Sequence, residues 1–208
     1  MKGRRILFWD FDGVIKESVA VKTEAFAWLF APFGDALVAR IREHHERHGG
    51  LSRLEKIPLY LSWAGQCATP SEVARYCSLF AAHVFQAVVD SAWVPGVREY
   101  LQAHHLHQHF VLISATPQEE IERILETLDI GRYFREVHGA PTAKSQAVAA
   151  VLARCNCPPG EALVVGDSAA ELEAAAANGV EFLLRRTSLN SELQRRHNGQ
   201  QCDDFLQH

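Results

Sequence analysis

Side chains that could take part in catalysis stand directly after three short apolar runs of the sequence. They are Asp10 and Asp12 in the segment DFDGV, Ser114 in the segment SATP, and Asp167 and Glu171 in the segment GDSAAE. Lys144 stands at the start of the helical pattern that precedes the third run. Carboxylates can act as nucleophiles, proton donors or metal ligands, whereas hydroxyl and ammonium groups can hold an anion.

The elements that would position these side chains alternate between strands and helices. Buried parallel strands are predicted at the apolar runs 6–9, 110–113, 162–165 and 180–184, with a weaker candidate at 134–137. Helical patterns lie between them at 96–104, 117–128, 143–154 and 169–178. The alternation predicts an α/β fold, with a Rossmann-like parallel sheet flanked by helices.

Ligands of open parallel sheets bind at the carboxyl ends of the strands, where the acidic and hydroxyl side chains are expected. Taken singly, each has an ordinary structural explanation. Acidic turn residues are common, Ser114 or Ser168 could cap a helix, and a helical lysine such as Lys144 is usually solvated. Several such signals at one edge, in chain order, are hard to obtain by chance, so we interpret this edge as a candidate active site.

The stretch between the first two predicted strands interrupts the alternation. From about residue 19 to residue 92 the apolar residues follow a helical period, and no strand is predicted there. We therefore predict two domains: a core of residues 1–17 and 93–208, and an inserted small α-helical cap domain of residues 18–92. The polar tail after Ser188 is expected to be loosely held.

The motifs resemble those of the haloacid-dehalogenase-like hydrolase superfamily. Four motifs carry the resemblance, in chain order: DFDGV at 10–14, Ser114, Lys144 and GDSAAE at 166–171. The helical insert lies where this family places its mobile cap, which makes the sequence similar to the phosphoglycolate-phosphatase-like branch. One departure is Glu171, where many members carry aspartate.

The resemblance implies a phosphatase that uses Mg²⁺ and forms an aspartyl-phosphate on Asp10. The family pattern implies that the Asp10 carboxylate, the Asp12 backbone carbonyl and Asp167 bind the ion, with Glu171 supporting it through water. A phosphate monoester is doubly anionic, so it approaches these carboxylates only with a cation between them. Mg²⁺ suits this need because it prefers oxygen ligands and bridges to substrate phosphate.

The resemblance also implies a role for Asp12 as general acid and base. Asp12 would protonate the departing alkoxide and later remove a proton from the attacking water, and nearby carboxylates are expected to raise its pKa. Ser114, the Ala115 amide and Lys144 would hold the phosphoryl oxygens. Dehalogenases of the superfamily do not need this acid, so Asp12 favours phosphoryl chemistry.

The cap is expected to select the substrate, a small phosphorylated metabolite such as a sugar phosphate. Ser52 follows two glycines and predicts a helix start, with Arg53 and Lys56 one turn apart on one face. These two cations either form a solvated basic face or bind an anionic leaving group. The sequence leaves both interpretations open.

Composition argues against several other classes of protein. The 208 residues carry a formal charge of −4, with 48% hydrophobic and 22% charged residues, which suits a globular protein without a nucleic-acid partner. No apolar run approaches the roughly 18 residues of a membrane span, and a cytoplasmic enzyme is expected. Two alternatives stay open: a β-phosphoglucomutase-like phosphotransferase that uses the same two aspartates, and a non-catalytic binding module on the same fold.

Overall fold

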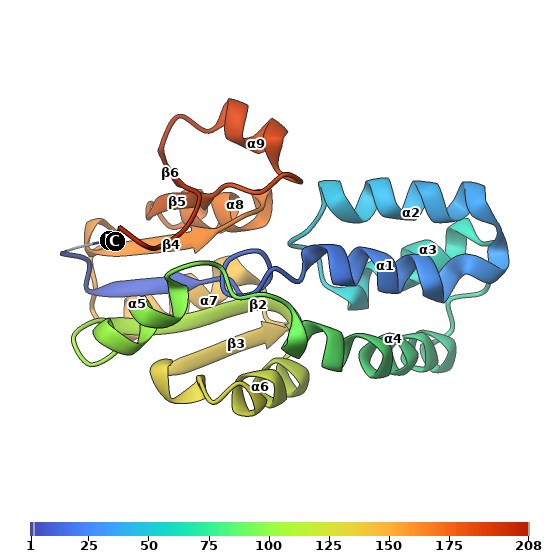
Figure 1. Ribbon diagram of the computed structural model, residues 1–208, viewed down its shortest axis with the longest axis horizontal. Helices are drawn as coiled ribbons and strands as arrows, with labels where there is room; N and C mark the ends of the chain where they lie inside the picture. Colours follow the sequence, from blue (N-terminus) through green and yellow to red (C-terminus); the bar gives the residue numbers. More distant parts are fainter. Residues whose placement is uncertain (2, 208) are drawn as a thin grey trace.

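The computed structural model describes Met1 and residues 3–207. Its strands form one parallel sheet in the order β3-β2-β1-β4-β5-β6, with helices on both faces (Figure 1). β1 is central, because Trp9 at its end lies beside Leu112 of β2 and Val165 of β4. The residues that follow β1 therefore emerge at the middle of the carboxyl edge of the sheet.

The strand positions agree closely with the apolar runs. The strands are β1 (Ile6–Trp9), β2 (His109–Pro117), β3 (Glu136–Ala140), β4 (Ala162–Gly166), β5 (Glu181–Arg185) and β6 (Gln200–Cys202). β2 extends beyond its predicted run at both ends, and β3 begins later than predicted. The predicted α/β class with a Rossmann-like parallel sheet is confirmed.

Two hydrophobic cores hold the sheet between helical layers. Phe8 belongs to the same core as Val148 of α7, whereas Trp9 belongs to the core that includes Ile121 of α6. Successive side chains of β1 thus enter opposite faces, as a strand buried on both sides requires. The helices of these layers are α5 (Val97–His104), α6 (Gln118–Thr127), α7 (Lys144–Arg154) and α8 (Ala169–Ala177).

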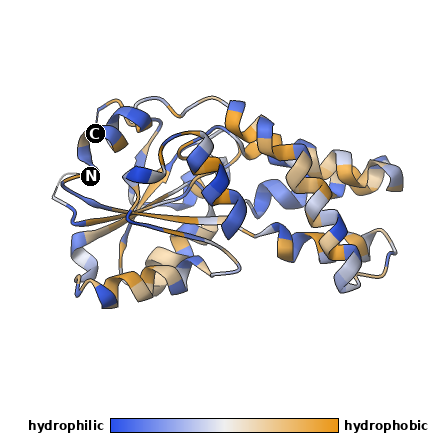
Figure 2. Ribbon diagram, turned by 90° about the horizontal axis from the view of Figure 1, so that it is seen from below, coloured by the Kyte–Doolittle hydropathy of each residue, from blue (hydrophilic) through white to orange (hydrophobic). Residues whose placement is uncertain are grey.

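The predicted helical insertion is confirmed and lies beside the carboxyl edge of the sheet, to the right in Figure 1. Its helices are α1 (Val19–Phe30), α2 (Asp35–Arg47), α3 (Arg53–Trp63) and α4 (Pro70–Asp90). They meet around Phe26, whose ring centroid lies 4.2 Å from that of Phe80 and 5.3 Å from that of Tyr60. Figure 2 shows apolar and polar stretches alternating along these helices, as expected where each helix buries one face. Within the described part of the chain, none of the helices has the length and apolar character needed to cross a membrane.

The expectation of a loosely held tail is wrong. α9 (Ser191–Arg196) is followed by β6, which pairs with β5. The backbone N–H of Arg186 donates to Cys202 at 2.8 Å, and the ring centroid of Phe205 lies 5.3 Å from that of Trp9. The polar composition hid this strand, because only Cys202 of its three residues is buried.

Candidate active site

Lys144 joins two carboxylates at the carboxyl edge of the sheet. Its ammonium donates to Oδ1 of Asp10 at 2.7 Å and also to Oε1 of Glu171. All three side chains are buried, and they come from the loop after β1 and the first turns of α7 and α8. Burial lowers the pKa of Lys144, but the two carboxylates outweigh burial and raise its pKa above the usual value. Lys144 therefore keeps a positive charge beside Asp10.

Asp167 completes an acidic group that could hold a metal ion. One oxygen each from Asp10, Asp167 and Glu171 lies within 4.8 Å of the other two. Burial and repulsion from Glu171 and Asp10 raise the pKa of Asp167 well above its usual value. A divalent cation would relieve this repulsion, and carboxylate oxygens are the ligands that Mg²⁺ prefers. The residues present therefore fit a hard divalent cation.

Gly13 leaves the space that Asp167 occupies. Its φ is +75°, and a Cβ atom at this position would lie 2.1 Å from Oδ2 of Asp167. Gly65 in the cap has a similar φ of +69°, but a Cβ atom there would meet nothing within 4 Å. Both glycines thus adopt a positive φ that other residues rarely adopt, but only Gly13 has a neighbouring side chain that a Cβ atom would meet.

We expect Gly13→Ala to weaken Mg²⁺ binding by ~10–100-fold, the range seen when groups that orient metal ligands are altered. The added methyl group would displace the Asp167 carboxylate, which isothermal titration calorimetry with Mg²⁺ would detect. Gly65→Ala is the matched control, because it adds the same backbone strain away from the acidic group. Equal Mg²⁺ affinities in the two variants would contradict a role for Asp167 as ligand.

A capping box at the start of α8 fixes Glu171. Ser168 Oγ accepts a hydrogen bond from the Ala170 N–H at 3.2 Å, and Oε2 of Glu171 accepts one from the Ser168 N–H at 2.9 Å. Gly166 permits this packing, because a Cβ atom there would lie 2.3 Å from Cγ of Glu171. Ser168 therefore has the capping role that its position predicts, and Glu171 combines capping with its contact to Lys144.

Asp12 is held by side chains of the first cap helix and its N-cap. Ser18 donates to Oδ1 of Asp12 at 2.6 Å, and the Lys22 ammonium forms an ion pair with Oδ2. Lys22 also donates to Oγ1 of Thr116 at 2.7 Å. Burial raises the pKa of Asp12, but Lys22 and Ser18 outweigh burial, so the pKa is lower than usual. The expectation of a raised pKa is therefore wrong here, because it considered the carboxylates and not Lys22.

Ser114 and Ala115 lie near the end of β2, next to the loop that carries Asp12. Ser114 is buried, and its Oγ accepts a hydrogen bond from the Thr116 N–H at 3.1 Å. It does not cap α6, whose N-cap residue is Pro117. Ala115 and Thr116 both line a small pocket together with Asp12. The end of β2 thus lies beside Asp12 and reaches the cap, where Lys22 contacts Thr116.

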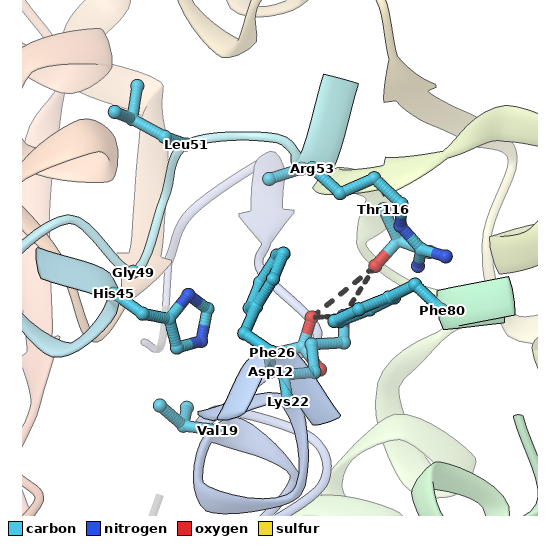
Figure 3. Close-up of a pocket in the computed structure, with 11 residues that line it drawn as sticks. Asp12, Val19, Lys22, Phe26, His45, Gly49, Leu51, Arg53, Phe80 and Thr116 are labelled. Atoms are coloured by element: carbon cyan, nitrogen blue, oxygen red, sulfur yellow. Dashed lines mark hydrogen bonds and ion pairs between the residues drawn. The ribbon is translucent and has the colours of Figure 1, made fainter. Parts of the chain in front are cut away.

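This pocket lies between core and cap, and Figure 3 shows the side chains around it. Its polar lining includes Asp12, Lys22, His45, Arg53 and Thr116, and its apolar lining includes the rings of Phe26 and Phe80. It encloses about 40 Å³, which is room for a few water molecules only, since one water needs ~10–15 Å³. The cap is therefore closed over Asp12 in this structure, whereas a larger cavity of about 460 Å³ between cap and core is lined by Gly49, Asp167 and Ser168.

Arg53 and Lys56 are both buried, so the interpretation as a solvated basic face is wrong. The Arg53 guanidinium donates to Oε2 of Glu120 on α6 at 2.9 Å and to its other oxygen as well. The Lys56 ammonium lies 2.8 Å from Nδ1 of His45. Both cations lie on the buried side of α3, together with Ile57, which belongs to the hydrophobic core.

Three polar residues of the pocket were not predicted from the sequence: Lys22, Thr116 and His45. Lys22 stands one turn from both Val19 and Phe26, and this apolar face signals that its charge is buried. His45 follows the buried Ile41 by one helical turn, which is the same kind of signal. Both signals are weak, because they do not show what the buried polar group contacts.

Comparisons with known proteins agree with this geometry. The family described as haloacid dehalogenase-like hydrolase matches residues 5–179. A phosphoglycolate phosphatase of Pseudomonas fluorescens is 28% identical over 184 residues, which cover 85% of this chain and 67% of that protein.

Two solved structures share the fold at low identity. A mutant of CbbY from Rhodobacter sphaeroides, in complex with xylulose-1,5-bisphosphate, has a TM-score of 0.78 at 16% identity and covers 98% of this chain and 96% of its own. A β-phosphoglucomutase from Clostridium difficile has a TM-score of 0.76 at 18% identity and covers 97% of this chain and 92% of its own.

The family match spans most of the chain, including β1 to β4 and the helical insertion. The relatives that match in sequence are phosphatases. The resemblance found in the motifs is thereby confirmed. This chain belongs to the haloacid-dehalogenase-like hydrolase family, in its phosphoglycolate-phosphatase-like branch, and is a phosphatase.

Proposed function

We propose that this phosphatase hydrolyses the phosphate monoester of a small metabolite through an aspartyl-phosphate on Asp10, with Mg²⁺ as its cofactor. The observation that carries the proposal is the buried group of Asp10, Asp167 and Glu171 around Lys144. A nucleophilic carboxylate, further oxygen ligands and a fixed cation are the parts that phosphoryl transfer requires.

The Asp10 carboxylate, the Asp12 backbone carbonyl and Asp167 would hold the ion, with Glu171 supporting it through water. When bound, Mg²⁺ would offset the negative charge of the carboxylates and of the substrate phosphate. Burial and the repulsion from Glu171 and Asp10 together raise the pKa of Asp167, which supports a cation at this position.

The reaction would proceed in two steps. An Asp10 oxygen forms a bond to phosphorus while the ester oxygen leaves with a proton from Asp12. Asp12 then removes a proton from water, and the resulting hydroxide oxygen attacks phosphorus and releases Asp10 and inorganic phosphate. Ser114, the Ala115 amide and Lys144 would hold the phosphoryl oxygens in both steps.

Lys22 has to release Asp12 before Asp12 can donate a proton. In the closed arrangement the ion pair with Lys22 favours the ionised carboxylate. The cavity of about 40 Å³ is also too small for a phosphate ester. We propose that the cap opens to admit the substrate, and that anionic oxygens of the substrate then compete with Asp12 for Lys22.

The domain division remains part of this proposal, with the core at 1–17 and 93–208 and the cap at 18–92. The helices α1 to α4 all lie within 18–92, which supports the division. The cytoplasm is the proposed location, as the sequence predicts.

The proposal is tested by measuring inorganic phosphate release from a panel of phosphorylated metabolites, with Mg²⁺ and with EDTA. Release is expected with Mg²⁺ and is expected to stop in EDTA. An isomeric sugar phosphate formed without free phosphate would instead indicate a mutase. If folded protein saturated with Mg²⁺ releases no phosphate from any member, the proposed hydrolysis is wrong.

Arg53 is proposed to help select the substrate, because it lines the pocket beyond Asp12. We expect Arg53→Ala to raise KM for the best substrate of the panel by ~10-fold or more, the usual range for a lost hydrogen bond to a charged group. The effect on p-nitrophenyl phosphate should be much smaller, because its leaving group has no anionic substituent that Arg53 could bind. Equal effects on the two substrates would argue that Arg53 only holds the cap to Glu120.

A further inference from the structure

We propose that a second metal site, which binds Zn²⁺, is formed by His109, Glu136 and Cys155. One ligand atom from each of these three side chains lies within 4.8 Å of those from the other two. The three residues lie at the amino edge of the sheet, where the strands begin, whereas the acidic group lies at the carboxyl edge. The ion would hold the fold together, so the proposal does not depend on the proposed function.

The register of the parallel strands brings the three side chains to one face of the sheet. His109 begins β2, and Glu136 begins β3 beside Val111 of β2. His109 and Val111 stand two residues apart, so both side chains and that of Glu136 point to the same face. Val111 shares a core with α7 on that face, and Cys155 is the C-cap residue of α7. Figure 1 shows the arrow of β3 pointing towards the cap, so its first residue lies away from the cap.

The imidazole of His109 lies between the other two side chains. Its Nδ1 is 3.9 Å from Sγ of Cys155, and its Nε2 is 3.6 Å from Oε1 of Glu136. The second distance is too long for a hydrogen bond. Two ligands of one tetrahedral Zn²⁺ lie ~3.4 Å apart when they are nitrogen and oxygen, and ~3.6 Å apart when they are nitrogen and sulfur. A small movement of the ring would therefore present one nitrogen to both neighbours.

A nitrogen of His109 lacks a partner, which is independent support for a ligand at this position. Nε2 is buried and has no hydrogen-bond partner in the part of the chain that the structure describes. Buried polar atoms nearly always have a partner, so this one indicates a bound ion or water molecule. Burial lowers the pKa of His109 in spite of the nearby Glu136. The ring is therefore neutral and keeps a lone pair for a metal.

Glu136 is oriented by two neighbours that leave one of its oxygens for the metal. Its Oε2 accepts hydrogen bonds from His138 at 3.1 Å and from Arg154. Its Oε1 is the oxygen that faces His109. Hydrogen bonds of this kind fix the carboxylates that ligate metals. The side chains of His109 and Glu136 are each 22% exposed, so an ion can enter from solvent and keep a water molecule as its fourth ligand.

The donor atoms at the two edges of the sheet favour different metals. Thiolate sulfur and imidazole nitrogen are ligands of Zn²⁺, whereas Mg²⁺ prefers oxygen ligands. The acidic group offers oxygen atoms alone, from Asp10, Asp167 and Glu171. We therefore expect Zn²⁺ to bind at the amino edge while Mg²⁺ occupies the carboxyl edge. Zn²⁺ would then connect β2, β3 and the end of α7.

The test is isothermal titration calorimetry of Zn²⁺ into the full-length protein, with a phosphine reductant and saturating Mg²⁺. We expect one equivalent to bind, and Cys155→Ser to weaken this binding by ~100-fold or more. Altering a group that only orients metal ligands already costs ~10–100-fold, and here a ligand itself is lost. Cys67→Ser is the matched control, because it makes the same change on an exposed cap residue, and it should bind Zn²⁺ like the wild type.

His109→Gln is the second variant, and it keeps the test decisive if Cys155→Ser does not fold. It should weaken Zn²⁺ binding by ~10-fold at least, as for the loss of a group at a metal site. His107→Gln is its control, since His107 is exposed and stands two residues earlier. Zn²⁺ should also raise the melting temperature of the wild type, because it binds the folded state, but not that of either site variant.

Co²⁺ in place of Zn²⁺ shows whether sulfur is a ligand. A thiolate bound to Co²⁺ gives a charge-transfer absorption in the near ultraviolet, which neither carboxylates nor imidazoles produce. We expect this absorption in the wild type and in Cys67→Ser, and its loss in Cys155→Ser. It therefore separates the proposed site from Co²⁺ bound to the acidic group or to exposed histidines.

Three outcomes would overturn the proposal. The first is a reduced wild-type protein that binds no Zn²⁺ in the presence of Mg²⁺. The second is equal Zn²⁺ affinity in the wild type and in the folded variants Cys155→Ser and His109→Gln. The third is bound Co²⁺ without the charge-transfer absorption, which would leave His109 and Glu136 as a long ion pair only.

Discussion

Replacing Asp10 by asparagine is expected to lower the rate of phosphate release by ~10⁴-fold or more, as for the loss of a catalytic nucleophile. The amide has nearly the same shape but cannot form a bond to phosphorus. Its oxygen can still accept a hydrogen bond from Lys144, which donates to Oδ1 of Asp10 at 2.7 Å. The variant should therefore fold, and kcat for p-nitrophenyl phosphate with saturating Mg²⁺ is the measurement.

Asp129→Asn is the matched control for this substitution. It makes the same chemical change on an exposed residue after α6, whose φ of 54° suits asparagine. Its kcat should equal that of the wild type. A folded Asp10→Asn protein that retained more than ~1% of the wild-type rate would contradict covalent catalysis by Asp10, because loss of the nucleophile should cost far more.

Replacing Asp12 by asparagine is expected to lower kcat by ~10²–10⁴-fold, the range for a lost general acid or base. The loss should be larger for an alkyl phosphate than for p-nitrophenyl phosphate, because a good leaving group needs less help from a proton. The second step should also slow, since no carboxylate remains to remove a proton from the attacking water. The measurement is rapid-mixing kinetics with both esters.

The two aspartate variants should differ in the first turnover. Asp12→Asn is expected to release close to one equivalent of p-nitrophenol per protein and then stall, whereas Asp10→Asn should release none. A steady, slow rate without this burst would place the effect of Asp12 in the first step alone. The same losses for alkyl and aryl esters would contradict a role in protonating the leaving group.

The core of this protein could be predicted from the sequence because its signals are local. Apolar runs such as Ile6–Trp9 form strands that are buried on both faces. A short continuous apolar run of this kind is typical of a parallel sheet covered by helices on both sides. Asp10 and Asp167 follow neighbouring strands, β1 and β4, so their approach to one another follows from the parallel order. β6 was missed, since three residues with a single buried side chain leave no pattern to detect.

The cap could be predicted only as a group of helices. Which polar side chain reaches the core depends on how the helices cross, and a helical period contains no information about crossing. The ion pair between Lys22 and Asp12 is the clearest case, because it reversed the expected direction of the Asp12 pKa shift. Arg53 is a second case, since the sequence gives no sign that Glu120 on α6 would bind it.

The buried cations of the cap bear on catalysis, because one of them, Lys22, forms an ion pair with Asp12. Lys22, Arg53 and Lys56 bring three cations into the interior between cap and core, and only Lys22 and Arg53 bind carboxylates. We therefore expect ligand binding to rearrange this group, because a bound substrate must enlarge the pocket and move Lys22 away from Asp12.

Chemical trapping of the phosphorylated residue tests the central claim most directly. Asp12→Asn protein would be mixed with a phosphate ester and Mg²⁺, quenched with acid, reduced with borohydride and digested for mass spectrometry. Borohydride converts an aspartyl-phosphate to homoserine, so homoserine is expected at position 10, and only when both ester and Mg²⁺ are present. Phosphate release that continues with unmodified Asp10 in every sample would contradict the account, because water would then attack the ester directly.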